Sequence, residues 1–185
     1  NIDGFFNILE SCRNYPVKYL LYASSSSVYG NNEKLHFSED DNVDHPVSLY
    51  AATKKSNELM ASTYSHLYGI QTTGLRFFTV YGPWGRPDMA IYKFTEAIVN
   101  NKPIQVFAEG KLYRDFTYID DIINGILAIL DKQKTTTPPD LMNIGNNHPE
   151  GVNTLVAELE KILKTKVQIE YLPMQPGDVL ATFAN

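Results

Sequence analysis

The sequence predicts an α/β fold in which a mostly parallel sheet is covered by helices on both faces. Two observations carry this prediction. Segments with apolar residues at helical spacing alternate along the chain with short, continuously apolar segments that are typical of buried strands. Hydrophobic residues make up 43% and charged residues 20% of the 185 residues, as in ordinary globular proteins. Alternation of this kind favours parallel strands joined by crossover helices.

The first part of the chain predicts two helices and two strands. Apolar residues recur at helical spacing over residues 2–12, and residues 17–23 then form an apolar run typical of a buried strand. After a serine run and a polar loop, Ser48 is placed to cap a helix that Gly69 ends. The strand that follows covers residues 71–78.

The rest of the chain predicts further alternation after a loop rich in glycine and proline. We expect helices near residues 89–100, 119–130 and 152–163. We expect short strands near residues 104–107, 115–118, 141–144 and 167–171. Asp120 and Asp121 stand at the start of a predicted helix, which favours a capping role over chemistry.

Composition and charge exclude several classes of function. The net charge is −5 and no Lys/Arg cluster accompanies aromatic residues, so a nucleic-acid partner is not expected. No apolar run reaches the ~18 residues of a membrane span, and no signal peptide is recognisable. The single cysteine, Cys12, fits a reducing, cytoplasmic location. The four histidines lack metal-ligand spacing, so we expect no metal site.

Tyr50 and Lys54 form a candidate catalytic pair. They stand four residues apart at the start of the helix that Ser48 caps, so their side chains lie on one face. A neighbouring ammonium and the positive helix N-terminus both favour the phenolate, which could then act as a base. Chance alone gives roughly one Tyr–Lys spacing of this kind in such a chain, so the pair needs support from its surroundings.

That support is a serine run at residues 24–27, which follows the first predicted strand. Open α/β sheets place their sites at the carboxyl ends of strands, where a hydroxyl could bind a reacting oxygen. The alternative is a polar loop that merely closes the strand, and this is as good an explanation for the run taken alone. Together with Tyr50 and Lys54, the run favours a functional site.

Arg86 and Arg114 are candidate anion ligands, because each lies in or beside a loop rich in Gly or Pro that follows a predicted strand. A guanidinium group there suits a carboxylate or a phosphate. An equally good alternative is that each arginine pairs with a neighbouring acid such as Asp88 or Asp115.

One expected feature of a nucleotide-binding α/β sheet is missing from the sequence. The chain contains neither Gly-x-Gly-x-x-Gly nor Gly-x-x-x-x-Gly-Lys, the motifs that cradle phosphates. It also opens on Asn1 and runs directly into a helical pattern, which suggests a piece of something longer.

Five segments together resemble the extended short-chain dehydrogenase/reductase family, and within it the UDP-glucuronate 4-epimerases. The resemblance extends over essentially the whole chain and rests on YASSSSVYG (residues 22–30), HPVSLYAATKKSNELM (45–60), LRFFTVYGPWGRPDMA (75–90), RDFTYIDDI (114–122) and MQPGDV (174–179). Related dehydratases and decarboxylases carry an acid just before the Val-Tyr-Gly, where this chain has Ser26 and Ser27, so epimerisation fits better. The family's Asp after MQPGDV is replaced by Asn185.

The resemblance implies a role for each matching residue. It implies that Tyr50 is the catalytic base, that Lys54 supports it and holds the nicotinamide ribose of NAD, and that Ser25 binds the sugar 4-hydroxyl. The remaining implied positions are Phe77 beside the nicotinamide, Ser26 and Ser27 near the sugar, Thr79 and Arg86 at its carboxylate, Val106 beside uracil, and Arg114 with Asp178 at the diphosphate and ribose.

The resemblance also implies an organisation and partners. Residues 1–80 would be the carboxy-terminal part of a Rossmann-like NAD-binding domain. Residues 81–185 would mainly form a small mixed α/β domain that binds the nucleotide sugar, with a return to the first sheet near residues 114–145. The implied substrate is a UDP-sugar for surface-polysaccharide precursors, and the implied assembly is a homodimer. Alternatives are another UDP-sugar 4-epimerase, a dehydratase or decarboxylase, or a silent fragment or partner-binding module without the phosphate turn.

Overall fold

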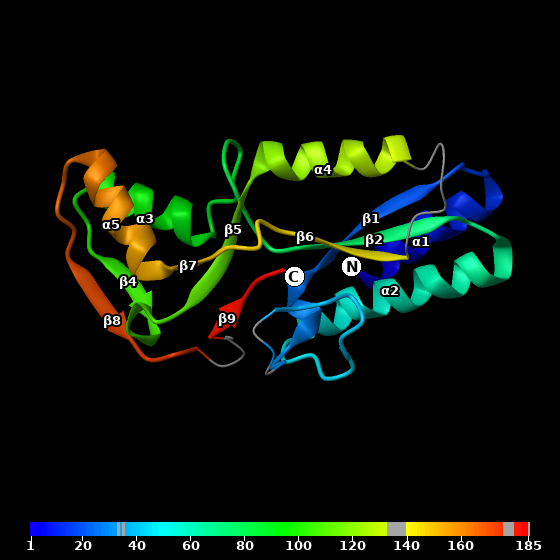
Figure 1. Ribbon diagram of the computed structural model, residues 1–185, viewed down its shortest axis with the longest axis horizontal. Coiled ribbons are helices and arrows are strands. Elements are labelled where there is room, and N and C mark those ends of the chain that lie inside the picture. Colours follow the sequence, from blue (N-terminus) through cyan, green and yellow to red (C-terminus); the bar gives the residue numbers. More distant parts are fainter. Residues whose placement is uncertain (33, 35, 133–139, 176–179, 185) are drawn as a thin grey trace.

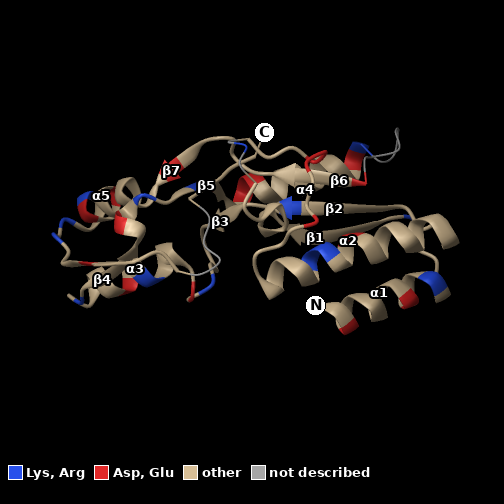
Figure 2. Cartoon of the chain, turned by 90° about the horizontal axis from the view of Figure 1, so that it is seen from below, with Lys and Arg blue, Asp and Glu red and all other residues tan. Residues whose placement is uncertain are grey.

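The first layer of the fold is a parallel sheet of three strands with helices on both faces (Figure 1). The computed structural model describes residues 1–32, 34, 36–132, 140–175 and 180–184. The strand order is β1 (Leu20–Ser25), β2 (Thr72–Phe77) and β6 (Leu141–Ile144). Helices α1 (Ile2–Asn14) and α2 (Leu49–Tyr68) lie side by side on one face, and α4 (Ile119–Lys132) lies on the other (Figures 1 and 2).

A second group of strands continues from the end of this sheet. Strand β3 (Thr79–Tyr81) pairs in parallel with β5 (Tyr113–Tyr118). Strand β5 also pairs antiparallel with β7 (Pro149–Gly151) and in parallel with β9 (Ala181–Thr182), which lie on opposite sides of it because both pair with Tyr113 and Arg114. Since β3 begins two residues after β2 ends, it carries the chain directly from the first sheet into the second group.

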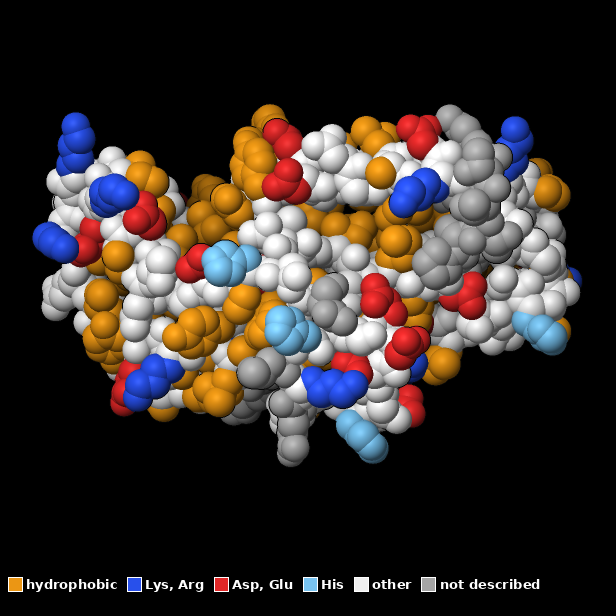
Figure 3. Space-filling model, viewed as in Figure 1, with side chains coloured by type: hydrophobic (Ala, Val, Ile, Leu, Met, Phe, Trp, Pro, Cys, Tyr) orange, Lys and Arg blue, Asp and Glu red, His pale blue; other side chains and the backbone are white. Residues whose placement is uncertain are grey.

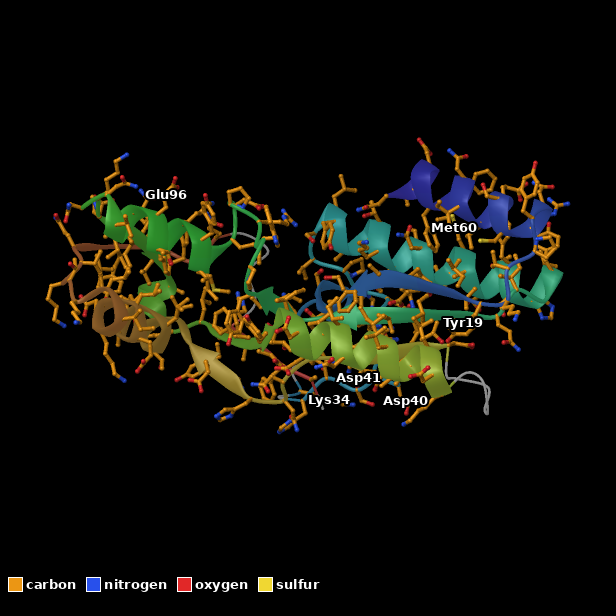
Figure 4. All side chains as sticks on the ribbon, turned by 90° about the horizontal axis from the view of Figure 1, so that it is seen from above. Tyr19, Lys34, Asp40, Asp41, Met60 and Glu96 are labelled. Atoms are coloured by element: carbon orange, nitrogen blue, oxygen red, sulfur yellow. The ribbon has the colours of Figure 1, made fainter. Side chains whose placement is uncertain are left out.

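The remaining elements form a lobe around a second hydrophobic core. Strands β4 (Ile104–Phe107) and β8 (Ile169–Leu172) pair in parallel, and α3 (Ala90–Val99) packs against α5 (Val152–Leu163). Two short 3₁₀ helices, η1 (Ser26–Tyr29) and η2 (Ala108–Gly110), follow β1 and β4. Figure 4 places Glu96 of α3 in this lobe and Met60 of α2 in the other.

The local signals at the two ends of α2 are confirmed. The Ser48 hydroxyl accepts a hydrogen bond from the Ala51 backbone N–H over 3.1 Å, so it caps the helix as predicted. Gly69 adopts the left-handed conformation, with φ of 67°, and its N–H bonds to the Ser65 carbonyl. These two residues set where the helix that carries Tyr50 and Lys54 begins and ends.

The prediction of a parallel α/β sheet covered on both faces is confirmed, although several boundaries differ. The strand expected at residues 17–23 begins at Leu20 and continues to Ser25, because its partner β2 begins at Thr72, opposite Leu20. The short strands β3, β7 and β9 were not predicted, since two or three residues carry no periodicity of their own.

Two further features bear on the predicted organisation. Strand β6 joins the first sheet beside β2, but the division into two domains at residue 80 stays a prediction. Asp120 and Asp121 lie inside the first turn of α4, where the positive end of the helix dipole favours carboxylates.

Among the described residues, no helix combines the length and the apolar character needed to cross a bilayer.

Candidate active site

Tyr50 and Lys54 stand on the first turns of α2, beside the end of β1. The Lys54 ammonium donates a hydrogen bond to the Ala23 carbonyl oxygen over 3.0 Å. Its nitrogen lies 5.9 Å from the centroid of the Tyr50 ring. Partial burial lowers the pKa of Lys54 below the ordinary lysine value, because desolvation penalises the ammonium. Tyr50 is 49% exposed, so its hydroxyl can be reached by a ligand.

The serine run turns the chain at the carboxyl end of β1. Ser25 is the last residue of the strand, and its hydroxyl accepts a hydrogen bond from the Ser27 backbone N–H over 3.2 Å, which caps η1. The hydroxyl oxygens of Ser25 and Ser27 are 2.5 Å apart. Ser26 opens η1, and the turn ends at Gly30 with φ of 58°. The hydroxyl groups of Ser25 and Ser27 therefore lie together in one tight turn at the strand end.

The end of β2 lies next to this turn. Phe77 pairs in register with Ser25 of β1 and with Ile144 of β6, so all three stand in the last row of the sheet. Thr79 follows at the start of β3, opposite Phe116. The predicted residues Ser25, Phe77 and Thr79 thus lie along one edge, as parallel strands require.

A cavity of about 890 Å³ begins at Thr79 and lies in the second lobe; Ser25, Tyr50, Lys54 and Phe77 are not among the residues that line it. It lies among β3, α3, β4 and β5, and its walls include Thr79, Arg86, Met89, Phe107, Arg114 and Gln175. Figure 3 shows this face of the molecule hollowed between the lobe of α3 and α5 and the start of α4. A volume of this size is in the range of small-molecule and cofactor sites.

Arg86 lines the cavity and pairs with Asp88. Its Nε and Nη2 donate to the two carboxylate oxygens of Asp88 over 3.0 and 2.5 Å. These hydrogen bonds raise the pKa of Arg86, and Tyr50 adds a smaller contribution through its charge. The alternative that Arg86 pairs with a neighbouring acid is therefore seen, and both partners face the cavity. Binding of a ligand carboxylate by Arg86 stays a prediction.

Arg114 also lines the cavity, from β5, and donates to the Tyr113 carbonyl oxygen over 2.9 Å. Its neighbour Asp115 is fully buried and accepts hydrogen bonds from the backbone N–H groups of Asn146, Asn147 and Ala184. Asp115 therefore ties loops to β5. The predicted ligand Asp178 lies outside the described residues.

Val106 differs from its expected place. Its side chain is fully buried in the hydrophobic core of the second lobe and is not among the residues that line the cavity. Its neighbours Gln105 and Phe107 line the cavity instead. Because alternate residues of a strand point to opposite faces, a contact with uracil at this position would use the Val106 backbone.

Sequence reasoning missed a buried ion pair just behind these residues. Glu58 of α2 and Arg76 of β2 join through two hydrogen bonds of 2.9 Å and are almost fully buried. A signal was present in the sequence, because Arg76 stands within an apolar strand and a buried arginine requires an acidic partner.

The residues at the sheet edge fit the nicotinamide end of NAD, whereas the sequence contains no glycine-rich motif that would cradle its pyrophosphate. Lys54 is fixed beside Tyr50 by its bond to Ala23, which pairs with Leu75 two rows before Phe77, and its ammonium would hold the ribose. A Gly-rich phosphate turn is not found in the sequence. Ser25, Tyr50, Lys54 and Phe77 would therefore hold one end of the cofactor only.

Comparisons with known proteins agree with this arrangement. Residues 1–145 match the model of the NAD dependent epimerase/dehydratase family. The chain is 53% identical to Protein CapI of Staphylococcus aureus and 50% identical to UDP-glucuronate 4-epimerase 4 of Arabidopsis thaliana; both matches cover all of this chain, but 60% and 46% of those proteins.

A solved structure gives the same result. It is the UDP-glucuronic acid 4-epimerase from Bacillus cereus in complex with UDP-glucuronic acid and NAD. It superimposes with a TM-score of 0.94 at 35% identity, over 100% of this chain and 58% of that one. The chain thus spans 46% to 60% of the length of these relatives, and it belongs to the NAD dependent epimerase/dehydratase family.

Proposed function

We propose that this chain supplies the catalytic residues and the sugar-nucleotide cavity of an NAD-dependent 4-epimerase that converts UDP-glucuronate to UDP-galacturonate. The observation that carries the proposal is the placement of Ser25, Tyr50 and Lys54 at one sheet edge, next to a cavity that two arginines line. The similarity to UDP-glucuronate 4-epimerases supports the choice of substrate.

In this proposal Tyr50 takes the proton from the sugar 4-hydroxyl. The adjacent Lys54 ammonium stabilises the phenolate, and its hydrogen bond to the Ala23 carbonyl holds it in place. Ser25 orients the hydroxyl that loses its proton. NAD, when bound, would accept the C4 hydride and give it back to the opposite face of the turned 4-keto sugar, which inverts C4 with no net redox change. Tyr50 would return its proton to the 4-oxygen.

The cavity fits the rest of the substrate. Thr79 and Arg86 both line the cavity and would hold the sugar carboxylate. Arg114 on β5 would bind the diphosphate, and Asp178 would bind the ribose. A guanidinium group binds either anion through paired hydrogen bonds, which explains anion binding by a chain of net charge −5.

Two features of the assembly belong to the proposal. A homodimer is supported by the paired helices α1 and α2, which expose the apolar side chains Phe6, Ile8, Leu59 and Leu67. A cytoplasmic location is supported by Cys12, the only cysteine, which is buried and unbridged.

A second candidate is a silent or partner-binding fragment, which the lack of a phosphate turn in these 185 residues favours. Two measurements separate the candidates. Calorimetric titration of this chain with NAD tests the silent reading, which micromolar binding would eliminate. Incubation of the complete protein that contains this chain with UDP-glucuronate should yield UDP-galacturonate on anion-exchange chromatography, and no product from a protein loaded with NAD would reject the proposal.

A further inference from the structure

A buried polar network lies directly behind the candidate active site, and the proposed reaction does not use it. We call it the Glu58–Arg76 network. Arg76 of β2 is 1% exposed and binds both carboxylate oxygens of Glu58 over 2.9 Å. Ser24 donates to Glu58 over 2.6 Å. On the other side, Arg76 donates to the Tyr29 hydroxyl over 3.0 Å, which in turn donates to the Asn143 amide oxygen.

The network occupies the row of the sheet just before the active-site row. Ser24, Arg76 and Asn143 pair in register across β1, β2 and β6. The next row contains Ser25 and Phe77. Any shift of the network along the strands would therefore move α2 relative to the residues that border the site.

On α2, Glu58 lies one turn beyond Lys54 and two turns beyond Tyr50, on the same side of the helix. The Lys54 ammonium bonds to the Ala23 carbonyl oxygen, and the Glu58 carboxylate bonds to Ser24. Two successive turns of α2 are thus tied to two successive residues of β1.

The apolar contacts of α2 cannot set this position by themselves. The buried residues of the helix are Ala51, Asn57, Glu58 and Ala61, so its only buried apolar side chains are those of two alanines. Small side chains leave no ridge to lock into the sheet, and such a helix can slide or rotate at little cost in packing. A bidentate guanidinium–carboxylate pair is directional and forms in one arrangement only.

We propose that Glu58 and Arg76 are positioning residues. They set the position of α2 along the strands and its rotation about its own axis, so that Lys54 and Tyr50 stand near the carboxyl ends of β1 and β2. The placement of Lys54 follows from the contacts above. Its consequence for turnover rests on the proposed function.

The test uses substitutions that keep the charge and change the geometry of the side chain. Glu58→Asp shortens the side chain by one methylene, and Arg76→Lys removes the paired N–H donors of the guanidinium group. Asp115→Glu is the matched control, since Asp115 is equally buried and its hydrogen-bond partners Thr117, Asn146 and Ala184 lie on β5, after β6 and after β9. Each chain is labelled with ¹³C at the lysine Cε, and Lys54 is titrated by NMR below the unfolding temperature.

In Glu58→Asp and Arg76→Lys we expect the pKa of Lys54 to rise towards that of an exposed lysine, because the ammonium leaves its partly buried site. Asp115→Glu should lower the melting temperature and leave the Lys54 titration unchanged. In the complete protein the first two variants should lose about 10- to 100-fold in kcat, as a misplaced catalytic group does. The KM for the UDP-sugar should stay within about twofold, because the network does not line the cavity.

Folded Glu58→Asp and Arg76→Lys chains in which Lys54 titrates as in the wild type would overturn the proposal. If neither folds, Ser24→Ala decides, since it removes only the hydroxyl that bonds to Glu58. A higher pKa of Lys54 in Ser24→Ala than in the wild type supports the proposal, and an unchanged pKa rejects it. The titration does not depend on turnover, so failure of the epimerase proposal would be seen separately, as no product from the wild-type protein.

Discussion

The Lys54 ammonium donates its hydrogen bond to the Ala23 carbonyl oxygen over 3.0 Å, two residues before Ser25 on the same strand. The bond crosses from helix to strand and places a cation two residues before the serine turn. The first turn of α2, which carries Tyr50, is thereby tied to the strand that ends at Ser25. This contact links the catalytic pair to the sheet.

The burial of Lys54 predicts a pH dependence of stability. Its pKa is below 10.5 in the folded chain and ordinary in the unfolded chain. Between the two values the unfolded chain holds a proton that the folded chain has released, so this group's contribution to the free energy of unfolding rises with pH. Below that window the cost of burying the ammonium is fully present.

Urea unfolding at a series of alkaline pH values checks this expectation. The free energy of unfolding of the wild type minus that of Lys54→Met should rise with pH through the window. The same difference for Lys102→Met, which removes an exposed lysine, should stay flat. A flat curve for Lys54→Met would show that the ammonium is not desolvated.

Tyr50→Phe should abolish most of the turnover of the complete protein. The substitution removes the group that accepts the 4-hydroxyl proton and leaves the ring, so a loss of about 10²-fold or more in kcat is expected. Stopped assays of UDP-galacturonate formation measure it. Tyr15→Phe is the control, because Tyr15 follows α1 and is 79% exposed, and this variant should keep full activity. Near wild-type turnover in Tyr50→Phe would refute the assignment.

Arg86→Ala should weaken the binding of UDP-glucuronate more than that of UDP-glucose. Only the former offers a carboxylate to the guanidinium group, and losing a charge-assisted pair costs about 10- to 100-fold in KM. The remaining Asp88 carboxylate would add repulsion against the same substrate. Steady-state kinetics of the complete protein with both sugars give the ratio, and equal losses on the two would remove Arg86 from the carboxylate site.

How much of the fold could be predicted depends on how local each signal is. Ser48 and Gly69 act on their own backbone, and so the ends of α2 were predicted correctly. The start of β1 depends on where β2 begins, and the two residues of β9 form a strand only beside β5. Pairing of this kind is set by distant segments and leaves no period in the sequence.

The candidate site divides in the same way. Tyr50 and Lys54 are one helical turn apart, so their common face could be predicted from spacing alone. Whether Arg86 pairs with Asp88 depends on the conformation of a loop. The sequence therefore left open both this pairing and the binding of a ligand anion by Arg86. The pairing of Glu58 with Arg76 needs the helix to lie on the sheet, which no local pattern specifies.

Gly145→Ala should destabilise the chain, because a Cβ at this position would stand 2.6 Å from Asp115 Oδ2 and 3.0 Å from the Ala184 Cβ. Asp115 cannot yield without losing the hydrogen bonds from Asn146 and Asn147, so the overpacking should cost about 1–3 kcal/mol. Gly4→Ala is the matched control: it adds the same methyl group in α1, with nothing within 4 Å, and should stabilise the helix by up to ~1 kcal/mol. Chemical denaturation gives the free energy of unfolding of both variants. No loss in Gly145→Ala would mean that the loop after β6 moves away from Asp115 at little cost.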